Sequence, residues 1–281
     1  MTRAHLEFIQ AQRLDWQASP WSLLAGTECK ILSQDEGSGA VYALIRYPTG
    51  WSRHDIGYVD AAEESLVLDG ELRRDGQLHA QHCYTRLPAG YPRHDAETVT
   101  GAVVLTFFDH EPRWRTGDPP AGRYDLSGAE PLLDAFEMPW ECAGMDPVYA
   151  SSGLRWKMLR GQIGDADTTM LVYCPPHLHP PQWRGPQEVH DCVEEMFLIS
   201  GDYLSNVGTM HEGAYFWRPP GIAHGPYGTR SGNLALIRTL GAALLNNWTS
   251  HEFEISRSPP LRPYLPPELS ARGKPWQPEA Y

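Results

Sequence analysis

His224 is the histidine whose surroundings say most about its chemistry. It ends the pattern Gly213-x5-Pro219-x-Gly221-x2-His224, in which a short apolar run stops at a Pro-Pro-Gly turn. Proline fixes φ and glycine accepts positive φ, so the pattern is typical of a strand that ends in a tight turn. The turn would hold the imidazole at a fixed place inside a β-barrel, which a metal ligand requires.

A second group of candidate ligands lies upstream. His190 is four residues before Glu194, and Glu194 is seven residues before Gly201. Imidazole nitrogen and carboxylate oxygen without thiolate suit Fe(II), Mn, Ni, Co or Zn. The sequence therefore predicts one divalent transition metal held by His190, Glu194 and His224. Fe(II) is our first choice, with Zn, Mn or Ni as alternatives.

Three residues compete for a remaining position at this metal. His177 and His179 form a His-x-His pair between prolines, and Glu188 lies two residues before His190. Glu188, His190 and Glu194 share parity, so an extended chain would place them on one face. We select His179 as the fourth ligand and leave His177 and Glu188 as alternatives. If Glu188 does not bind the metal, it is a candidate catalytic base.

Aromatic and apolar residues are frequent around these candidates. Alternate residues of barrel strands face the interior, so part of this set would line an apolar cavity suited to small organic acids or ketones. Arg218 and Arg238 could bind a carboxylate or enolate oxygen, with a surface salt bridge as the alternative role. Our candidate catalytic residues are Glu188 and Arg218. The aromatic and apolar residues are Tyr173, Trp183, Met196, Phe197, Tyr203, Tyr215, Phe216, Trp217 and Tyr227.

The chain carries its landmarks twice. A constant offset of 131 pairs Glu63 with Glu194, Gly70 with Gly201, Pro88 with Pro219 and Gly90 with Gly221. Four landmarks that share one offset indicate a duplicated domain. In the first copy, Val59 stands at the place of His190 and Arg93 at the place of His224. We therefore expect a degenerate first copy that serves packing, with a second metal held by His54, Glu63 and His94 as the alternative.

Short apolar runs alternate with glycine- and proline-rich turns, since the chain has 26 glycines and 25 prolines. This predicts short strands rather than long helices. In the first copy we expect strands at 41–47, 64–68, 83–87 and 102–108, and a short helix at 130–136. Residues 1–25 are expected to be a lead-in arm that packs on a neighbouring element. The predicted domains are 1–125, 126–255 with the metal site, and a Pro-rich tail at 256–281.

These motifs resemble those of the cupin superfamily. The resemblance is to bicupins related to the cupin domain of ChrR-type anti-sigma factors and to cupin dioxygenases of aromatic ketones and β-diketones. It covers residues 28–110 and 153–250, with Glu188 and Gly228 departing from the usual histidine and asparagine. It implies an all-β chain of two tandem cupin (jelly-roll β-barrel) domains, with short helical and Pro-rich extensions, and a divalent metal. It does not fix the reaction, because one fold hosts many functions.

Charge and composition exclude several classes of partner. The chain has 23 Lys and Arg against 35 Asp and Glu, a net charge of −12, which disfavours nucleic acid. Its apolar runs are too short to span a membrane, no signal peptide is visible, and five scattered cysteines suit reduced thiols. We expect a cytoplasmic homodimer with a small aromatic or oxygenated substrate and no membrane partner, because pairing would cover exposed strand edges.

Three functions fit these residues. We favour a mononuclear non-haem Fe(II) dioxygenase that cleaves a C–C bond of a small aromatic ketone, diketone or phenolic substrate. The first alternative is a redox-neutral, metal-dependent lyase or isomerase in which Glu188 or a tyrosine moves a proton. The second alternative is a zinc-holding, non-catalytic sensor or binding protein. The expected lack of an amino-terminal helical domain with a Cys/His zinc signature counts against it.

Overall fold

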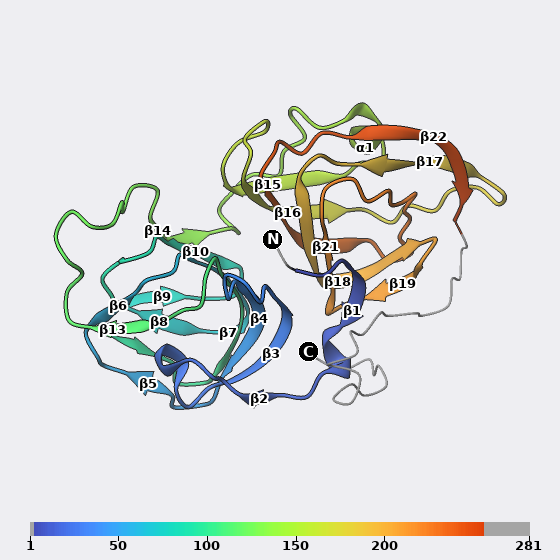
Figure 1. Cartoon of the computed structure of the whole chain (residues 1–281). Coiled ribbons are helices and arrows are strands. Elements are labelled where there is room, and N and C mark those ends of the chain that lie inside the picture. The colour runs from blue at the N-terminus through green and yellow to red at the C-terminus, as the bar shows by residue number, and fades with distance from the viewer. Residues whose placement is uncertain (1–2, 256–281) are drawn as a thin grey trace. The chain divides into compact units, whose positions relative to one another are not determined.

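The computed structural model describes residues 3–255, and its regular structure is almost entirely β (Figure 1). The predicted all-β fold class is confirmed. Within these residues the one α-helix is α1 (Pro147–Ser151), and none has the length and apolar character that crossing a membrane requires. The predicted Pro-rich tail at 256–281 lies outside the described residues.

The chain divides by internal contacts into two compact units. The first contains Trp16–Met138, and the second contains His5–Asp15 and the chain from Pro139 onward. The sequence had placed the boundary between residues 125 and 126. The difference arises because residues 130–134 form a strand, β14 (Glu130–Asp134), that pairs with β10 (Cys83–Leu87) of the first unit. The prediction of a short helix at 130–136 is therefore wrong.

The first unit is built on a seven-stranded sheet with the order β14-β10-β7-β12-β4-β3-β2. Three predicted strands are observed with the expected bounds, and the strand predicted at 64–68 is β7 at 63–70. The strands are β2 (Gln17–Ala18), β3 (Glu28–Gln34), β4 (Val41–Tyr47), β7 (Glu63–Gly70), β10 and β12 (Ala102–Phe108). Smaller sheets join β5 (Ser52–Arg53), β11 (Ala96–Glu97), β8 (Leu72–Arg74) and β9 (Gln77–His79), and β6 (Gly57–Val59) with β13 (Trp114–Thr116).

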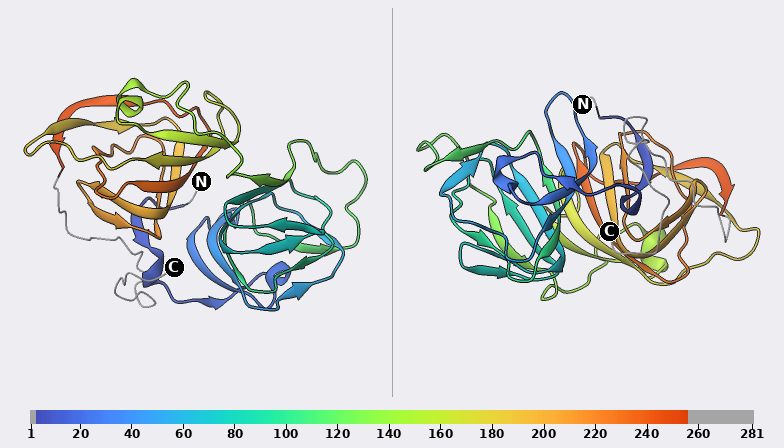
Figure 2. Two further views of the ribbon diagram at one scale, coloured as in Figure 1. Left: turned by 180° about the vertical axis from the view of Figure 1, so that it is seen from behind. Right: turned by 90° about the horizontal axis from the view of Figure 1, so that it is seen from below.

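The second unit has the same kind of main sheet, with the order β1-β20-β18-β21-β16-β15, and β19 paired to β18. Its strands are β1 (Leu6–Gln10), β15 (Arg155–Arg160), β16 (Thr168–Cys174), β18 (Val193–Ser205), β19 (Gly208–His211), β20 (Ala214–Arg218) and β21 (Asn233–Leu240). A separate two-stranded sheet joins β17 (Arg184–Val189) to β22 (Asn247–Glu254), whose orange-red ribbon can be followed in Figures 1 and 2. The amino-terminal arm thus supplies an edge strand, β1, to this unit.

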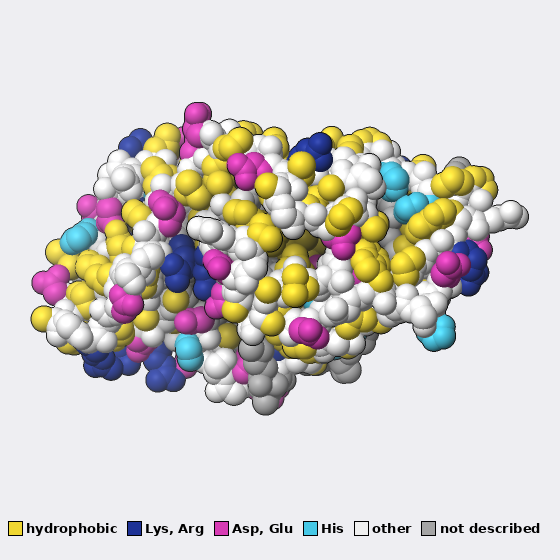
Figure 3. Space-filling view, turned by 90° about the horizontal axis from the view of Figure 1, so that it is seen from above, with side chains coloured by type: hydrophobic (Ala, Val, Ile, Leu, Met, Phe, Trp, Pro, Cys, Tyr) yellow, Lys and Arg dark blue, Asp and Glu magenta, His cyan; other side chains and the backbone are white. Residues whose placement is uncertain are grey.

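Side-chain alternation fills the interior of each unit. In β4, Val41, Ala43, Ile45 and Tyr47 belong to one buried apolar cluster, as the two-residue period of a strand requires. The second unit has its own clusters, with Phe8, Met196, Leu198, Met210, Ala214, Phe216 and Ala235 in one and Met145, Trp156, Met170 and Val172 in another. On the face drawn in Figure 3, acidic, basic and apolar side chains are mixed among the described residues.

The repeated glycines occupy equivalent and crowded positions. Gly70 has φ +70° and Gly201 has φ +84°, a region that favours glycine. A Cβ at Gly70 would lie 2.1 Å from the carbonyl oxygen of Gly101, and one at Gly201 would lie 2.0 Å from that of Gly232. Gly101 and Gly232 are themselves 131 residues apart. The repeat therefore preserves a backbone contact that no other residue type can make.

We predict that Gly201→Ala destabilises the second unit more than Gly221→Ala. Gly221 has a similar φ of +85°, but a Cβ there meets open space, so only backbone strain of about 1–2 kcal/mol is expected. At Gly201 the collision with the Gly232 carbonyl adds to the same strain. Chemical unfolding of the two variants measures the difference, and equal losses of unfolding free energy would contradict the crowding argument.

Candidate metal centre

The residues predicted from spacing meet at one place in the second unit. Glu188 is near the end of β17, His190 follows that strand, Glu194 is at the start of β18, and His224 lies in the turn after β20. Glu188 and His224 exchange two backbone hydrogen bonds of 3.0 Å, and the N–H of Gly221 donates to the carbonyl of His190 at 2.9 Å. The Pro-Pro-Gly turn is thus bonded directly to the segment that carries the upstream candidates.

Glu188, His190 and His224 are close enough to share one ion, and Glu194 approaches this group through His224. His224 Nε2 lies 3.4 Å from Glu194 Oε2 and 3.5 Å from Glu188 Oε1, and His190 Nε2 lies 3.7 Å from Glu188 Oε2. Ligand atoms of Glu188, His190 and His224 all lie within 4.8 Å of one another. Ligands bound about 2.0–2.2 Å from a metal are separated by roughly 3–4 Å, so the spacing fits a common ion.

Backbone carbonyls fix both imidazoles in the tautomer that a metal needs. His224 Nδ1 donates to the carbonyl of Ile222 at 2.8 Å, and His190 Nδ1 donates to the carbonyl of Leu245 at 2.9 Å. Each Nε2 is therefore left with a lone pair that faces the carboxylates. His224 Nε2 is buried and has no hydrogen-bond partner among the described residues. This arrangement is how proteins orient a metal-binding histidine.

The electrostatics of the cluster favour a bound cation. Burial, opposed by His190 and assisted by Glu194, raises the pKa of Glu188 to about 7. Burial lowers the pKa of His224 to about 4 despite the opposing effect of Glu194, so this imidazole is neutral at neutral pH. Burial raises the pKa of Glu194, but His224 and Arg218 outweigh burial and lower it, and the Arg218 guanidinium keeps the carboxylate ionised when His224 is neutral. Buried carboxylates with neutral imidazoles call for a compensating positive charge.

Arg218, a predicted catalytic residue, lies behind the cluster. Its Nη2 donates to Glu7 of β1 at 2.9 Å, and its Nη1 donates to Glu194 at 3.3 Å. It is absent from the described residues that line the two cavities of this unit. Arg218 and Arg238 are each 1% exposed, so surface salt bridges are excluded for both, and Arg238 pairs with buried Glu195. Arg218 therefore positions a carboxylate.

The structure does not bring the predicted ligand His179 to the cluster. Its Nε2 donates to the carbonyl of Tyr227 at 3.0 Å, and its ring stacks on Trp183 with 3.6 Å between centroids. His177 meets the same ring edge-on at 4.6 Å. The nitrogen that would bind a metal is thus already used by a carbonyl. Glu188, which the sequence left as an alternative, lies with His190 and His224 in its place.

Two cavities border the cluster. The larger, about 540 Å³, includes Glu188, His190 and Glu194 in its walls, and the smaller, about 400 Å³, includes Glu188 and His224. Apolar side chains dominate the larger one: Met145, Leu154, Trp156, Met170, Val172, Met196, Phe216, Ile237, Leu244 and Leu245. This composition suits a small organic molecule with few polar groups.

Three tyrosines add hydroxyl groups where the cavities meet. Tyr149, Tyr203 and Tyr227 line both, and burial raises the pKa of each well above the usual value. The hydroxyl of Tyr227 is buried without a hydrogen-bond partner among the described residues, so it is available to a substrate oxygen. Tyr149 comes from α1, whose start the Asp146-Pro147 pair marks in the sequence, since Asp146 accepts from the N–H of Val148.

The equivalent place in the first unit holds an ion pair. Arg93, at the position of His224, donates through Nη1 to Glu63, and Arg74 Nη1 lies 3.3 Å from the same carboxylate. Burial raises the pKa of Glu63, but Arg93 and Arg74 outweigh it and lower the pKa to about 2. A guanidinium from the chain itself thus supplies the positive charge there.

Comparison with known proteins identifies the class. Residues 133–242 match the family model of the ChrR Cupin-like domain, which covers most of the second unit. No curated protein sequence matches the chain. Together with the sheets and the His/Glu cluster described above, the match supports the predicted resemblance of the chain to the cupin superfamily.

Solved structures show the same fold over both units. A putative dioxygenase from Nostoc punctiforme has a TM-score of 0.71 at 17% identity, covering 89% of this chain and 86% of its own. Protein YlbA from E. coli has 0.55 at 14% identity, covering 86% and 94%. A variant of oxalate decarboxylase from Bacillus subtilis has 0.54 at 12% identity, covering 85% and 78%. At these identities the likeness shows the fold alone.

We predict that the pairing of Glu63 makes unfolding of the first unit acid-sensitive. A folded pKa of about 2 lies below the ordinary 4.5, so the contribution is full above the ordinary value and is lost as the pH falls towards 2. The loss is on the order of 3 kcal/mol. Urea unfolding between pH 5 and 2.5 should show a steeper fall for the wild type than for Glu63→Gln. Glu28→Gln, at a more exposed ion pair, should leave the slope unchanged.

We predict that His190→Ala and His224→Ala each weaken metal binding by more than about 100-fold, since removing a ligand exceeds the effect of removing its support. His179→Ala should keep the wild-type metal content, because its Nε2 binds a carbonyl. Metal analysis measures the metal content of each variant, and competition with a chelator measures its affinity for the metal. Retention of metal by Glu188→Gln together with its loss from His179→Ala would restore His179 as the ligand.

Proposed function

We propose that the chain is a metal-dependent dioxygenase that cleaves a C–C bond of a small aromatic ketone, diketone or phenolic substrate. The observation that carries the proposal is the buried cluster of two imidazoles and two carboxylates, of which Glu188, His190 and Glu194 line a 540 Å³ apolar cavity. His190, Glu194, His224 and Glu188 would hold the ion. Fe(II) there would act as a Lewis acid with positions left for substrate and oxygen.

The remaining residues of the site have positioning roles. The apolar walls exclude water and hold the carbon skeleton of the substrate. The free hydroxyl of Tyr227 donates a hydrogen bond to a substrate oxygen, which orients the molecule in the cavity. Arg218, fixed by Glu7, holds Glu194 towards His224. The Ile222 and Leu245 carbonyls keep both imidazoles in the binding tautomer.

A redox-neutral lyase or isomerase is the second candidate, and the state of Glu188 favours it. A carboxyl group with a pKa near 7 is suited to move a proton at neutral pH. Glu188 lies between the two cavities, within reach of a bound molecule in either. The two candidates differ in whether turnover consumes oxygen. The homodimer and the cytoplasmic location stay predictions from the sequence.

Oxygen uptake tests the proposed function. We expect the protein, reconstituted anaerobically with Fe(II), to consume oxygen with aromatic ketones, diketones or phenolic acids. Turnover without oxygen would instead establish the lyase or isomerase. Tight binding of zinc without turnover of any compound would favour the zinc-holding sensor or binding protein.

Within the same assay, Tyr227→Phe should lower kcat/KM by about 10-fold or more while metal content stays unchanged, because it removes a hydrogen-bond donor to substrate. Tyr124→Phe, a matched change in the first unit, should have no effect on turnover. Equal kinetics for wild type and Tyr227→Phe would remove Tyr227 from the site.

A further inference from the structure

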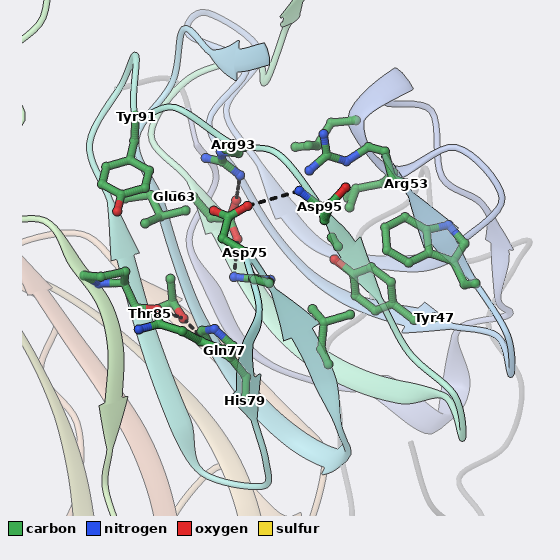
Figure 4. Close-up of a pocket in the computed structure, with 18 residues that line it drawn as sticks. Tyr47, Arg53, Glu63, Asp75, Gln77, His79, Thr85, Tyr91, Arg93 and Asp95 are labelled. Carbon is green, nitrogen blue, oxygen red and sulfur yellow. Dashed lines mark hydrogen bonds and ion pairs between the residues drawn. The ribbon is translucent and has the colours of Figure 1, made fainter. Parts of the chain in front are cut away.

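The first unit has a small cavity at the place that corresponds to the metal centre. Its volume is about 50 Å³, and its walls include Arg53, Glu63, Arg74 and Arg93 (Figure 4). Glu63 and Arg93 stand at the positions of Glu194 and His224. The cavity thus lies at strand ends equivalent to those of the metal centre, but it has guanidinium groups in place of imidazoles.

Arg93 has donors that nothing in the described part of the chain accepts. The residue is 7% exposed, its Nη1 donates to Glu63, and its Nε and Nη2 are buried without hydrogen-bond partners there. Elsewhere in this unit the same two nitrogens bind carboxylates together: Arg115 places Nε and Nη2 3.2 and 3.0 Å from Asp60 Oδ2. Arg93 therefore presents an unfilled bidentate donor pair, which is unfavourable to bury without an acceptor.

The charges around the cavity do not cancel in its buried part. Arg74 and Arg93 face one buried carboxylate, Glu63, whose side chain is 4% exposed. The cavity also has Asp75 and Asp95 in its walls. Asp75 acts on Arg74, but the two side chains are 39% and 62% exposed, so solvent screens their charges. Asp75 accepts the backbone N–H groups of His94 and Asp95 at 2.9 and 3.1 Å, and Asp95, whose side chain is 62% exposed, pairs with His54.

A third guanidinium adds to this excess. Arg53 lines the cavity and stacks over the ring of Trp114 at 4.3 Å. Burial lowers its pKa, and repulsion from Arg93 and Arg74 lowers it further. Positive groups so close together are relieved by an anion among them.

We propose that this cavity binds one small monocarboxylate, of the size of formate or acetate, on the Nε and Nη2 of Arg93. A carboxylate offers two coplanar oxygens that match this pair of donors. Its single charge neutralises the buried excess left by Arg74, Arg93 and Glu63. A cavity of 50 Å³ admits such an anion and excludes the aromatic molecules that fit the 540 Å³ cavity of the second unit.

Calorimetric titration of acetate into the full-length, metal-loaded protein tests the site. We expect Arg93→Gln to weaken acetate binding by about 10- to 100-fold, the effect of losing a charge-assisted donor pair. Arg115→Gln, the same change at a more exposed arginine of this unit, should bind like the wild type. His224→Ala distinguishes this site from acetate bound at the metal centre. This variant should retain the acetate binding that depends on Arg93.

Two further variants keep the test independent of folding. Arg93→Lys retains the charge opposite Glu63 but lacks the donor pair, so it should unfold at the wild-type temperature and still bind acetate at least about 10-fold more weakly. Glu63→Gln adds one unit of positive charge and should tighten binding. Equal isotherms for wild type and Arg93→Gln would overturn the site. Tighter binding of nitrate or phosphate than of acetate would overturn the carboxylate assignment.

Discussion

The candidate metal centre depends on a short stretch of backbone pairing. Glu188 and His224 exchange two hydrogen bonds, and Gly221 donates to His190, so the turn after β20 is fixed against the end of β17. These bonds place side chains from two distant segments within 3.4–3.5 Å of each other. Because the backbone sets the positions, the side chains need only carry the right donor atoms.

The cluster is supported by charge as well as by backbone. Arg218 sits between Glu7 and Glu194, so the carboxylate nearest His224 is held by a guanidinium that is itself held by β1. Burying two carboxylates together is unfavourable unless positive charge is supplied. Arg218 supplies part of it from behind, and an ion at the imidazoles would supply the rest. The amino-terminal strand is thereby part of the site, although it is far from it in sequence.

The sequence predicted what local spacing encodes and missed what long-range packing decides. His224 was predicted from the turn motif, and His190 and Glu194 from their spacing to Gly201. The offset of 131 also relates pairs that were not used to find it, since the hydroxyl of Tyr84 donates to Glu64 as that of Tyr215 does to Glu195. His179 was chosen over Glu188 because His-x-His is the stronger motif, but strand parity pointed to Glu188. Glu7 and Tyr149 reach the site only through tertiary contacts, which no spacing rule reveals.

The two units show how one backbone design can serve opposite charges. In the second unit a neutral imidazole at position 224 leaves buried carboxylates that need a cation. In the first unit a guanidinium at position 93 already compensates Glu63, and Arg74 adds charge beyond it. Arg93 in place of His224, Val59 in place of His190 and the added Arg74 together convert a place that attracts cations into one that attracts anions. On this argument the first unit carries a site of different chemistry, so its role extends beyond the packing that the sequence predicted.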